Sequence, residues 1–268
     1  MNYINCKEIA QNILDEVKAA NTPRGLLIIT VGNNPASESY IKGKVRDCEY
    51  CGVSCDIERP QTPEELEEAI IIGNMDKSIG GIIVQLPLPN GWDEDYYTSL
   101  VSDEKDVDGF KPNSAFAPCT PEGIVHLLKN EIEDLTGKNA LIIGRGKLVG
   151  KPLIDMLLKE NCTVTIAHSK TPEDELISLM KNSNIIISAA GKPGLIDPVH
   201  GRFGAIYIDA GVSKVDGKLH GDILSLEVVR NMHAKYEFYK EKRLTPVPGG
   251  VGLLTRAMLM KHMMEVNK

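Results

Sequence analysis

Short runs of apolar, β-branched residues alternate along the chain with longer segments in which apolar residues recur every three or four positions. The short runs predict buried strands, and the longer segments predict amphipathic helices. Strands are expected at residues 25–31, 53–58, 81–86, 139–143, 162–167, 184–189 and 205–209. Because alternating strands and helices favour a mostly parallel sheet covered by helices, the pattern indicates an α/β fold.

Several helix starts can be read from the sequence. Thr62-Pro63-Glu64-Glu65 combines an N-cap residue, a proline at the first helical position and a capping-box glutamate. Thr171-Pro172-Glu173-Asp174 repeats this arrangement with aspartate in the glutamate position. Thr120-Pro121-Glu122 is expected to begin another helix, and a last helix is expected from about Thr255.

A stretch rich in glycine and proline, residues 105–120, separates three of the expected strands from the other four. We therefore expect two αβ domains. The first comprises residues 1–119 with residues 248–268, and the second comprises residues 120–247. The Pro-Gly-rich segment 245–252 leaves the last helix free to return to the first domain.

Composition and charge narrow the classes of protein. The 268 residues are 42% hydrophobic and 25% charged, which is typical of a globular protein. A net charge of −7 argues against nucleic acid as the main partner, because such binders generally carry a basic patch. The chain has neither a signal-like segment nor a run of about 18 apolar residues, so we expect a cytoplasmic protein that does not bind membranes.

A metal or cluster motif is one interpretation of three closely spaced cysteines, Cys48, Cys51 and Cys55. Their spacing of three and four also places them on one stripe of a helix, and no fourth ligand lies nearby in the sequence. We favour core packing of these thiols and expect no metal site. Six cysteines in a long chain without an export signal indicate reduced thiols rather than a disulfide framework.

A glycine-rich turn follows the strand expected at residues 139–143. Gly144, Gly146 and Gly150 stand between a strand and a helix, where glycines let the backbone approach a pyrophosphate at the positive end of the helix. The spacing is G-x-G-x-x-x-G rather than G-x-G-x-x-G, and a plain tight turn is the alternative.

The following strand indicates which cofactor binds. It ends in His168-Ser169-Lys170, where an NAD site of this architecture usually has an acidic residue for the ribose hydroxyls. Ser169, Lys170 and the turn residue Arg145 instead offer hydrogen-bond donors and positive charge, which suit a 2′-phosphate. We therefore expect NADP; the alternative for Ser169 is a helix cap near Thr171.

Polar residues in the first half are candidates for substrate chemistry. Tyr40 and Lys44 lie one helical turn apart on the same face of an expected helix. Gln85 stands at the end of a buried strand, and Asp106 and Asp108 stand in a turn. The structural alternatives are a solvated helix face, a hydrogen bond from Gln85 to loop backbone, and stabilisation of the turn.

The Tyr40-x-x-x-Lys44 spacing also occurs in short-chain dehydrogenases, where the tyrosine is the acid. In those enzymes the glycine fingerprint comes first and the pair later. Here the pair precedes the glycine turn, so the chain order opposes this interpretation.

Seven segments together resemble, in order and spacing, the bifunctional methylenetetrahydrofolate dehydrogenase/cyclohydrolase family over essentially the whole chain. They are Tyr40-x-x-x-Lys44, Val84 to Pro89, Asp106 to Gly109, Pro118 to Pro121, Gly144-Arg145 with Val149-Gly150, His168 to Thr171, and Thr245 to Gly252. The resemblance implies a Rossmann-type, doubly wound NADP domain, a folate-binding domain completed by the C-terminal helix, and a cleft between them that holds the reaction. It also implies a homodimer.

The resemblance further implies roles for individual residues. Tyr40 is expected to stack against folate, and Asp108 to anchor the pterin. Lys44 is expected to be the catalytic amine, with Gln85 hydrogen-bonded to it. The Pro-Gly-Gly loop would lie beside folate and nicotinamide, which adds Pro248, Gly249 and Gly250 as substrate-binding candidates.

Arg145 and Ser169 are expected to contact the 2′-phosphate of the cofactor. The full set of cofactor-binding candidates is Gly144, Arg145, Gly146, Val149, Gly150, His168, Ser169 and Lys170. Two positions depart from the family pattern, which usually has Ser at Gly146 and Pro at Leu253. The first change is expected to weaken one cofactor contact, and the second to leave the Pro-Gly-Gly-Val-Gly loop less rigid.

The expected activity is oxidation of 5,10-methylenetetrahydrofolate with NADP, followed by hydrolysis of the methenyl product to 10-formyltetrahydrofolate. The expected partners are therefore tetrahydrofolate derivatives. Two alternatives remain open at this point: a dehydrogenase of another small substrate, and a non-catalytic folate- or nucleotide-binding protein.

Overall fold

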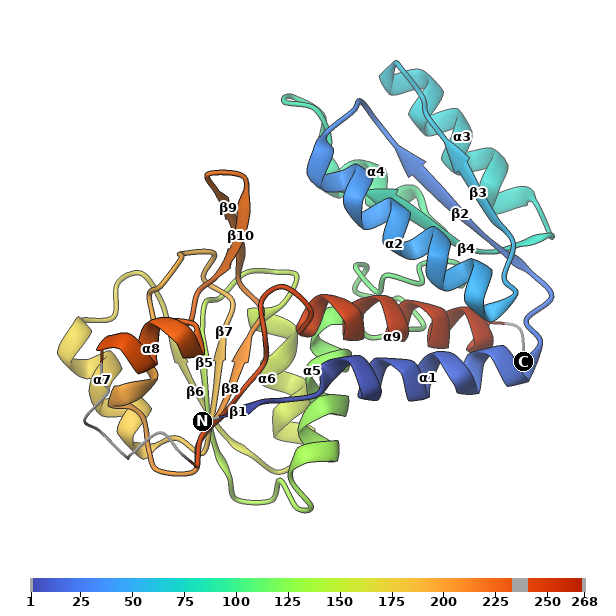
Figure 1. The fold of residues 1–268 in the computed structure, drawn as a ribbon. Coiled ribbons are helices and arrows are strands. Elements are labelled where there is room, and N and C mark those ends of the chain that lie inside the picture. Colours follow the sequence, from blue (N-terminus) through green and yellow to red (C-terminus); the bar gives the residue numbers. More distant parts are fainter. Residues whose placement is uncertain (1, 233–240, 267–268) are drawn as a thin grey trace. The chain divides into compact units, whose positions relative to one another are not determined.

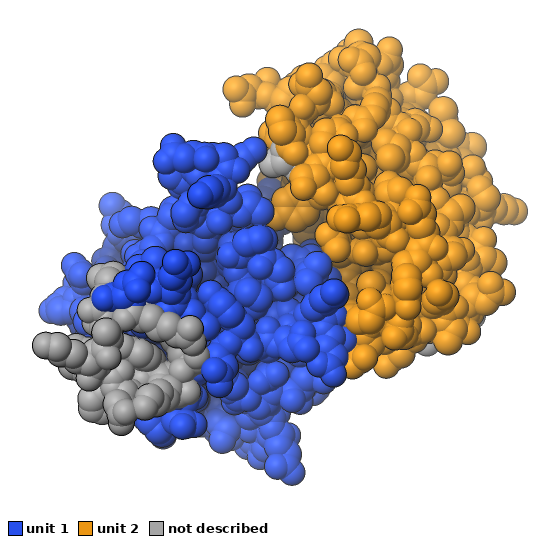
Figure 2. Space-filling view, viewed as in Figure 1, with its two compact units in different colours: residues 1–9, 120–255 blue, residues 10–119, 256–268 orange. Residues whose placement is uncertain are grey.

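The computed structural model describes residues 2–232 and 241–266, and Figure 1 shows their helices and strands. They form two compact units, coloured separately in Figure 2. Unit 1 consists of the described parts of residues 1–9 and 120–255, and unit 2 of residues 10–119 and 256–268. In this part of the chain, no helix combines the length and the apolar character that crossing a bilayer requires.

Unit 2 is built on a parallel three-stranded sheet of order β3-β2-β4. Its strands are β2 (Gly25–Thr30), β3 (Cys55–Glu58) and β4 (Ile79–Gln85). The helices are α2 (Pro35–Cys51), α3 (Pro63–Met75) and α4 (Glu94–Leu100), together with the greater part of α1 (Cys6–Ala20) and of α9 (Val251–Glu265). Every residue of β2 is buried, as expected for a central strand of a covered parallel sheet.

The C-terminal helix packs on unit 2, as the sequence predicted. Arg256 donates from Nε to Asp47 Oδ2 over 2.6 Å. Its guanidinium also lies against Gly43 of α2, where a Cβ would be only 2.3 Å from Nη1. Met263 reaches the sheet at Gly81 in the same way, because a Cβ there would lie 2.5 Å from its Sδ. Small residues on α2 and β4 therefore let α9 approach closely.

Unit 1 is built on a parallel six-stranded sheet of order β1-β11-β8-β7-β5-β6. Its strands are β1 (Asn2–Tyr3), β5 (Asn139–Ile143), β6 (Thr163–Ala167), β7 (Ile185–Ser188), β8 (Ile206–Asp209) and β11 (Arg243–Leu244). The chain leaves β5 for β6 on one side and then returns to β7 on the other side. This reversal confirms the predicted doubly wound sheet and places its switch point between β5 and β7.

The other elements of unit 1 flank this sheet or extend from it. The helices are α5 (Cys119–Glu131), α6 (Gly150–Lys159), α7 (Glu173–Asn182), α8 (Leu226–Met232) and the short 3₁₀ helix η1 (Pro198–His200). A separate antiparallel hairpin is formed by β9 (Val212–Val215) and β10 (Lys218–Gly221). A cluster of buried residues from the strands, α7 and α8 forms the core, with Leu141, Ile186, Tyr207 and Val229 almost wholly covered.

All seven expected strands are present, but the described residues contain four others that were not predicted. Strands β1 and β11 have two residues each, too few to show a periodicity, and they pair with each other. The hairpin strands β9 and β10 are largely exposed, so they lack an apolar run. Pairing of β1 with β11 explains why residues 1–9 belong to unit 1, whereas the sequence-based division places them with the first domain.

The predicted helix starts differ in outcome. The start of α3 follows the prediction, because Thr62 caps it by accepting from the amide of Glu65 over 3.2 Å. The capping box predicted at Thr171 is wrong, since Pro172 is the N-cap and Thr171 Oγ1 accepts from the amide of His168 over 3.0 Å. Helix α5 begins one residue before Thr120, and α9 begins at Val251 rather than near Thr255.

Candidate active site

Lys44 is the most deeply buried of the candidate catalytic residues in unit 2. Its side chain is 8% exposed on α2, and its Nζ donates to Gln85 Oε1 over 3.2 Å. Gln85 is the last residue of β4, and its Nε2 donates to the carbonyl of Leu86 over 2.8 Å. That second bond fixes the amide so that its oxygen faces the lysine. Within the described residues Lys44 has no carboxylate partner, so the amine is held without being neutralised by an ion pair.

Tyr40 lies one turn before Lys44 on the same helix and is 45% exposed. An exposed aromatic ring next to a buried amine offers an apolar face to a flat ligand while the amine remains within reach. The structure thus brings Tyr40, Lys44 and Gln85 together at the carboxyl end of the unit 2 sheet, which is where parallel sheets usually hold their ligands.

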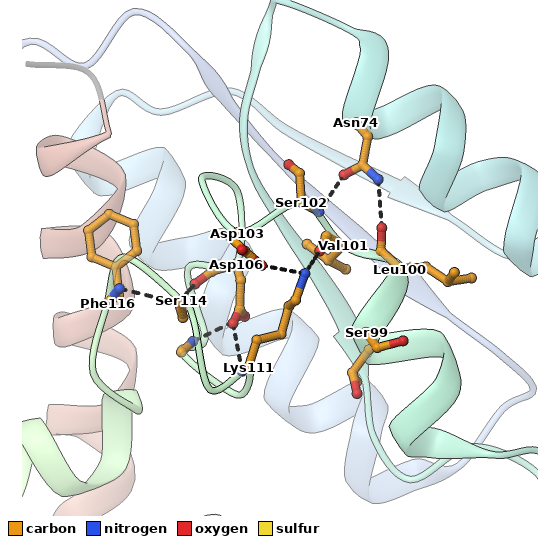
Figure 3. A network of polar contacts seen from close by, with 12 residues as sticks. Asn74, Ser99, Leu100, Val101, Ser102, Asp103, Asp106, Lys111, Ser114 and Phe116 are labelled. Atoms are coloured by element: carbon orange, nitrogen blue, oxygen red, sulfur yellow. Dashed lines mark hydrogen bonds and ion pairs between the residues drawn. The ribbon is translucent and has the colours of Figure 1, made fainter.

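The two turn aspartates have different surroundings (Figure 3). Asp106 is buried, and its carboxylate accepts from the amides of Gly109 over 3.2 Å and Lys111 over 2.9 Å, while its carbonyl accepts from Ser114 Oγ over 2.9 Å. Burial raises the pKa of Asp106 above its ordinary value. Asp108 is half-buried, and its carboxylate has no hydrogen-bond partner or ion pair in the part of the chain that is described. Asp106 therefore stabilises the turn, and Asp108 is available to a ligand.

Helix α3 holds the chain segment that precedes this turn. Asn74 donates from Nδ2 to the carbonyl of Leu100 over 2.7 Å and accepts from the amide of Ser102 over 2.9 Å. Lys111 pairs with Asp103 over 2.6 Å, and Figure 3 shows its amine between Asp103 and Val101. These contacts anchor the chain on both sides of the Asp106–Asp108 turn.

His262 of α9 supports the same turn, and the sequence reasoning missed it. Its Nδ1 lies 2.7 Å from the carbonyl of Val107, and its ring stacks on Phe116 with centroids 4.6 Å apart. Because the carbonyl can only accept, Nδ1 carries the proton. Cys119 adds a second donor to the same carbonyl over 3.2 Å. No local spacing could reveal the contacts of His262, which join it to residues more than a hundred positions away.

In unit 1 the glycine turn follows β5 as predicted. Gly144 has φ +116°, and a Cβ there would lie 2.4 Å from the carbonyl oxygen of Ala189. Gly150 begins α6, and its Cβ would lie 2.2 Å from the carbonyl oxygen of Gly144. Both glycines are required by close backbone contacts. Nothing lies within 4 Å of a Cβ at Gly146, so a serine side chain would fit there.

The beginning of α6 has no side-chain cap. Val149 is its N-cap and provides no side-chain hydrogen bond, so the first amides of the helix have no side-chain cap. Arg145 and Gly146 are exposed beside them. Lys151 donates its amide to the carbonyl of Gly146 over 3.0 Å, and Pro152 has no N–H, so within the first three residues of α6 only the amide of Gly150 is left for a pyrophosphate at the positive end of the helix.

The end of β6 lies next to the glycine turn. Ile143 and Ala167 are partners in the parallel pair β5–β6, and the amide of Gly144 donates to the carbonyl of Ala167 over 2.9 Å. His168 Nδ1 accepts from the amide of Lys170 over 3.2 Å and so shapes the turn. Ser169 and Lys170 are exposed there, and Ser169 does not cap α7.

The Pro-Gly-Gly segment precedes α9. Pro248 and Gly249 are exposed, and Gly249 has φ +94°, while Gly250 is buried against the carbonyl of Pro246. Leu253 lies in the first turn of α9 and donates its amide to the carbonyl of Gly250 over 3.0 Å. Proline has no N–H and could not make that bond. Leu253 therefore adds a hydrogen bond to the segment, whereas the sequence analysis expected it only to make the loop less rigid.

The three clustered cysteines do not share a helix stripe as expected, because α2 ends at Cys51 and Cys55 begins β3. Cys48 and Cys51 pack in the core as predicted. Burial raises the pKa of the Cys51 thiol to about 11, which keeps it protonated at neutral pH. No group of three His, Cys, Asp or Glu residues among those described is arranged to hold a metal ion.

Two buried carboxylates of unit 1, Asp209 and Asp222, also escaped the sequence reasoning. They are 2% and 0% exposed, and burial raises the pKa of Asp209 to about 7. The one signal for Asp209 is its place at the end of an apolar strand, the position that drew attention to Gln85. Asp222 follows the exposed strand β10, so nothing local marks it as buried.

Comparison with known proteins agrees with this architecture. Residues 4–108 match the family model described as tetrahydrofolate dehydrogenase/cyclohydrolase, catalytic domain, and residues 118–268 match that of the NAD(P)-binding domain. The bifunctional protein FolD of Agathobacter rectalis is 40% identical over 287 residues, which span 100% of this chain and 99% of that protein.

Solved structures agree as well. The bifunctional FolD enzyme of Campylobacter jejuni is 36% identical, with a TM-score of 0.89 over 98% of this chain and 97% of that one. The FolD enzyme of Trypanosoma brucei, solved with NADP cofactor and an inhibitor, is 32% identical, with a TM-score of 0.87 over 98% and 96%. The chain therefore belongs to the tetrahydrofolate dehydrogenase/cyclohydrolase family, as the seven segments predicted.

Proposed function

We propose that this chain is a bifunctional enzyme that oxidises 5,10-methylenetetrahydrofolate with NADP and hydrolyses the methenyl product to 10-formyltetrahydrofolate. Family membership and the similarity to bifunctional FolD proteins support both activities. The observation that carries the proposal is the buried Lys44 amine, held by Gln85 over 3.2 Å and without an ion pair among the described residues.

We infer that unit 2 binds the folate. The exposed ring of Tyr40 offers a stacking face, and the unpaired carboxylate of Asp108 can accept hydrogen bonds from the N–H groups of a pterin ring. The turn that carries Asp108 is fixed by Asp106 and His262 before any ligand arrives. A site that is ordered in advance loses less conformational entropy when the ligand binds.

Unit 1 has the features that NADP requires. Glycine residues at 144 and 150 leave room for close backbone approach, and the amide of Gly150 at the start of α6 can donate to the pyrophosphate. Arg145, Ser169 and Lys170 supply positive charge and a hydroxyl where an NAD site would have a carboxylate. When bound, NADP supplies the nicotinamide carbon that accepts the hydride.

The two reactions place different demands on the protein. Hydride loss from the methylene carbon is assisted by the lone pairs of its two neighbouring nitrogens, so the protein mainly orients the substrate. Hydration of the methenyl cation also requires removal of a proton from water. We assign this step to the amine of Lys44, with Gln85 holding it in place.

Rate measurements of the two reactions with the purified protein test this proposal. The purified protein should convert 5,10-methylenetetrahydrofolate and NADP to the methenyl compound, followed by its absorbance, and should hydrolyse added methenyltetrahydrofolate without cofactor. A dehydrogenase of another substrate would catalyse neither step, and a non-catalytic binding protein would bind ligand without turnover. Either of those results would contradict the proposal.

The expected homodimer and the expected cytoplasmic location remain predictions. Light scattering of the purified protein measures the first, and cell fractionation measures the second. A monomer in solution at the concentration of the enzyme assay would contradict the dimer without affecting the assignment of the reaction.

A further inference from the structure

A wholly buried carboxylate, Asp222, holds the loop that follows β7 in unit 1. Its Oδ2 accepts from Ser188 Oγ over 2.8 Å and from the amides of Ala190 and Gly191 over 2.7 and 3.1 Å. Its Oδ1 accepts from the amide of Lys192 over 2.7 Å. Three successive amides and one hydroxyl thus converge on a single carboxylate, an arrangement that ordinarily forms a nest for an external anion.

This loop is one wall of the glycine turn. Strands β5 and β7 are neighbours, and the carbonyl oxygen of Ala189 lies 2.4 Å from where a Cβ on Gly144 would be. The amide nitrogen of Ala190 lies 3.2 Å from the same point. Whatever fixes residues 189–192 therefore also fixes the space beside Gly144.

Asp222 is itself held by a second buried carboxylate. Asp209 Oδ1 accepts from the amide of Asp222 over 3.1 Å, and its Oδ2 accepts from the amide of Ile223 over 2.9 Å. Glycine is required opposite each carboxylate, because a Cβ at Gly211 would lie 2.0 Å from Asp222 Oδ2 and one at Gly221 would lie 2.0 Å from Asp209 Oδ2. The backbone is thus shaped around the two carboxylates.

We propose that Asp222 is a positioning residue for NADP, which fixes the Ala190–Lys192 loop against the glycine turn before the cofactor binds. The amides of this loop are already occupied by the protein's own carboxylate, so the cofactor phosphates are left to the glycine turn. Ordering the loop in advance lowers the entropic cost of binding. The inference rests on the proposed use of NADP.

Asp222→Asn is the direct test. Both carboxylate oxygens accept from amides, so an Asn side chain in either orientation would turn an NH₂ group toward a backbone N–H. The KM and the Kd for NADP should rise about tenfold or more, with kcat changed far less. Cofactor-free hydrolysis of methenyltetrahydrofolate, assigned to unit 2, should keep its wild-type rate.

Ser188→Ala is the milder variant, because it removes one of the four donors and leaves the carboxylate in place. It should raise the Kd for NADP about threefold, the scale of one hydrogen bond. Lys242→Met is the matched control. It removes a buried charge that bonds to the carbonyls of Pro198 and Gly201 near the amino ends of β8 and β11, whereas the loop held by Asp222 follows the carboxyl end of β7. This variant should leave the Kd unchanged.

The outcomes separate the possibilities. A folded Asp222→Asn protein with lower thermal stability but wild-type NADP affinity would show that the carboxylate is structural and would overturn the proposal. If Asp222→Asn does not fold, an unchanged Kd in Ser188→Ala overturns it instead. Failure of the wild-type protein to bind NADP would contradict the proposed function itself. If instead the wild-type protein binds NADP and neither variant changes the Kd, only the role of Asp222 is overturned.

Discussion

At the scale of single residues, the structure separates side chains that their spacing alone left equivalent. Asp106 and Asp108 stand two positions apart in one turn, yet the first is buried with its carboxylate bonded to two amides and the second has no partner among the described residues. Spacing cannot reveal which of two turn carboxylates points inward, because that depends on Gly109 and Lys111 folding back toward Asp106.

This difference predicts opposite phenotypes for two matched substitutions. Asp108→Asn should raise the KM for methylenetetrahydrofolate about tenfold with thermal stability unchanged, the scale of one lost hydrogen bond to a charged group. Asp106→Asn should lower the free energy of unfolding by about 1–3 kcal/mol, because a buried acceptor is lost. Steady-state kinetics and denaturant unfolding of both variants check this. Equal effects of the two substitutions on KM would remove Asp108 from the substrate site.

A second residue-scale prediction concerns the choice of cofactor. Ser169→Asp places a carboxylate at the exposed end of β6, where it should repel a 2′-phosphate and accept from ribose hydroxyls. The wild-type protein should have a higher kcat/KM with NADP than with NAD, and the variant should reduce this ratio at least about tenfold. Ser178→Asp, the same change on exposed α7, is the control. A wild-type preference for NAD would show that the phosphate pocket is misassigned.

At the scale of elements, periodicity located seven strands but not how the two-residue strands or the exposed hairpin strands pair. The strands β1 and β11 exist because they pair with each other and β11 with β8, a tertiary fact that two residues cannot encode. A helix does begin at Glu173, but Thr171 does not cap it, because its hydroxyl accepts from the amide of His168 instead. The turn that follows β6 uses the Thr171 hydroxyl, so the hydroxyl is not available to cap α7.

The connection between η1 and β11 predicts a pH dependence of stability. Lys242 is buried, and its amine donates to the carbonyls of Pro198 and Gly201. Burial lowers the pKa of Lys242 from 10.5 to about 8. Between these values the unfolded chain binds more protons than the folded one, so the contribution of this group to stability increases as pH rises.

The difference in unfolding free energy between wild type and Lys242→Met should therefore shift in favour of wild type as pH rises from about 8 to about 10. The expected shift is of the order of 1 kcal/mol per unit of pKa change. Urea unfolding of both proteins at matched ionic strength measures it. A difference that is flat across this window would mean that the lysine titrates normally in the folded protein.

At the scale of the whole molecule, the sequence predicted an α/β fold with a doubly wound second sheet, and the structure confirms it. Less of the candidate site could be predicted from the residues alone. Lys44 and Gln85 meet across 41 positions, and only the family resemblance suggested that bond before the structure placed it at 3.2 Å. Asp222 and His262 carried no local signal, because burial of a polar side chain depends on elements distant in the sequence.

The central claim is that Lys44 serves hydration while hydride transfer depends on orientation, and Lys44→Met tests it most directly. Methionine keeps most of the apolar stem and deletes the amine. Lys42→Met, on an exposed position of the same helix, is the matched control and should resemble wild type in both activities.

The measurement is the rate of each activity in the folded Lys44→Met protein. Hydrolysis of methenyltetrahydrofolate should fall about 10²-fold or more, the usual scale for a lost general base, while methylenetetrahydrofolate oxidation with NADP stays measurable. Wild-type hydrolysis by the Lys44→Met protein would contradict the account and would require another base for the hydration step.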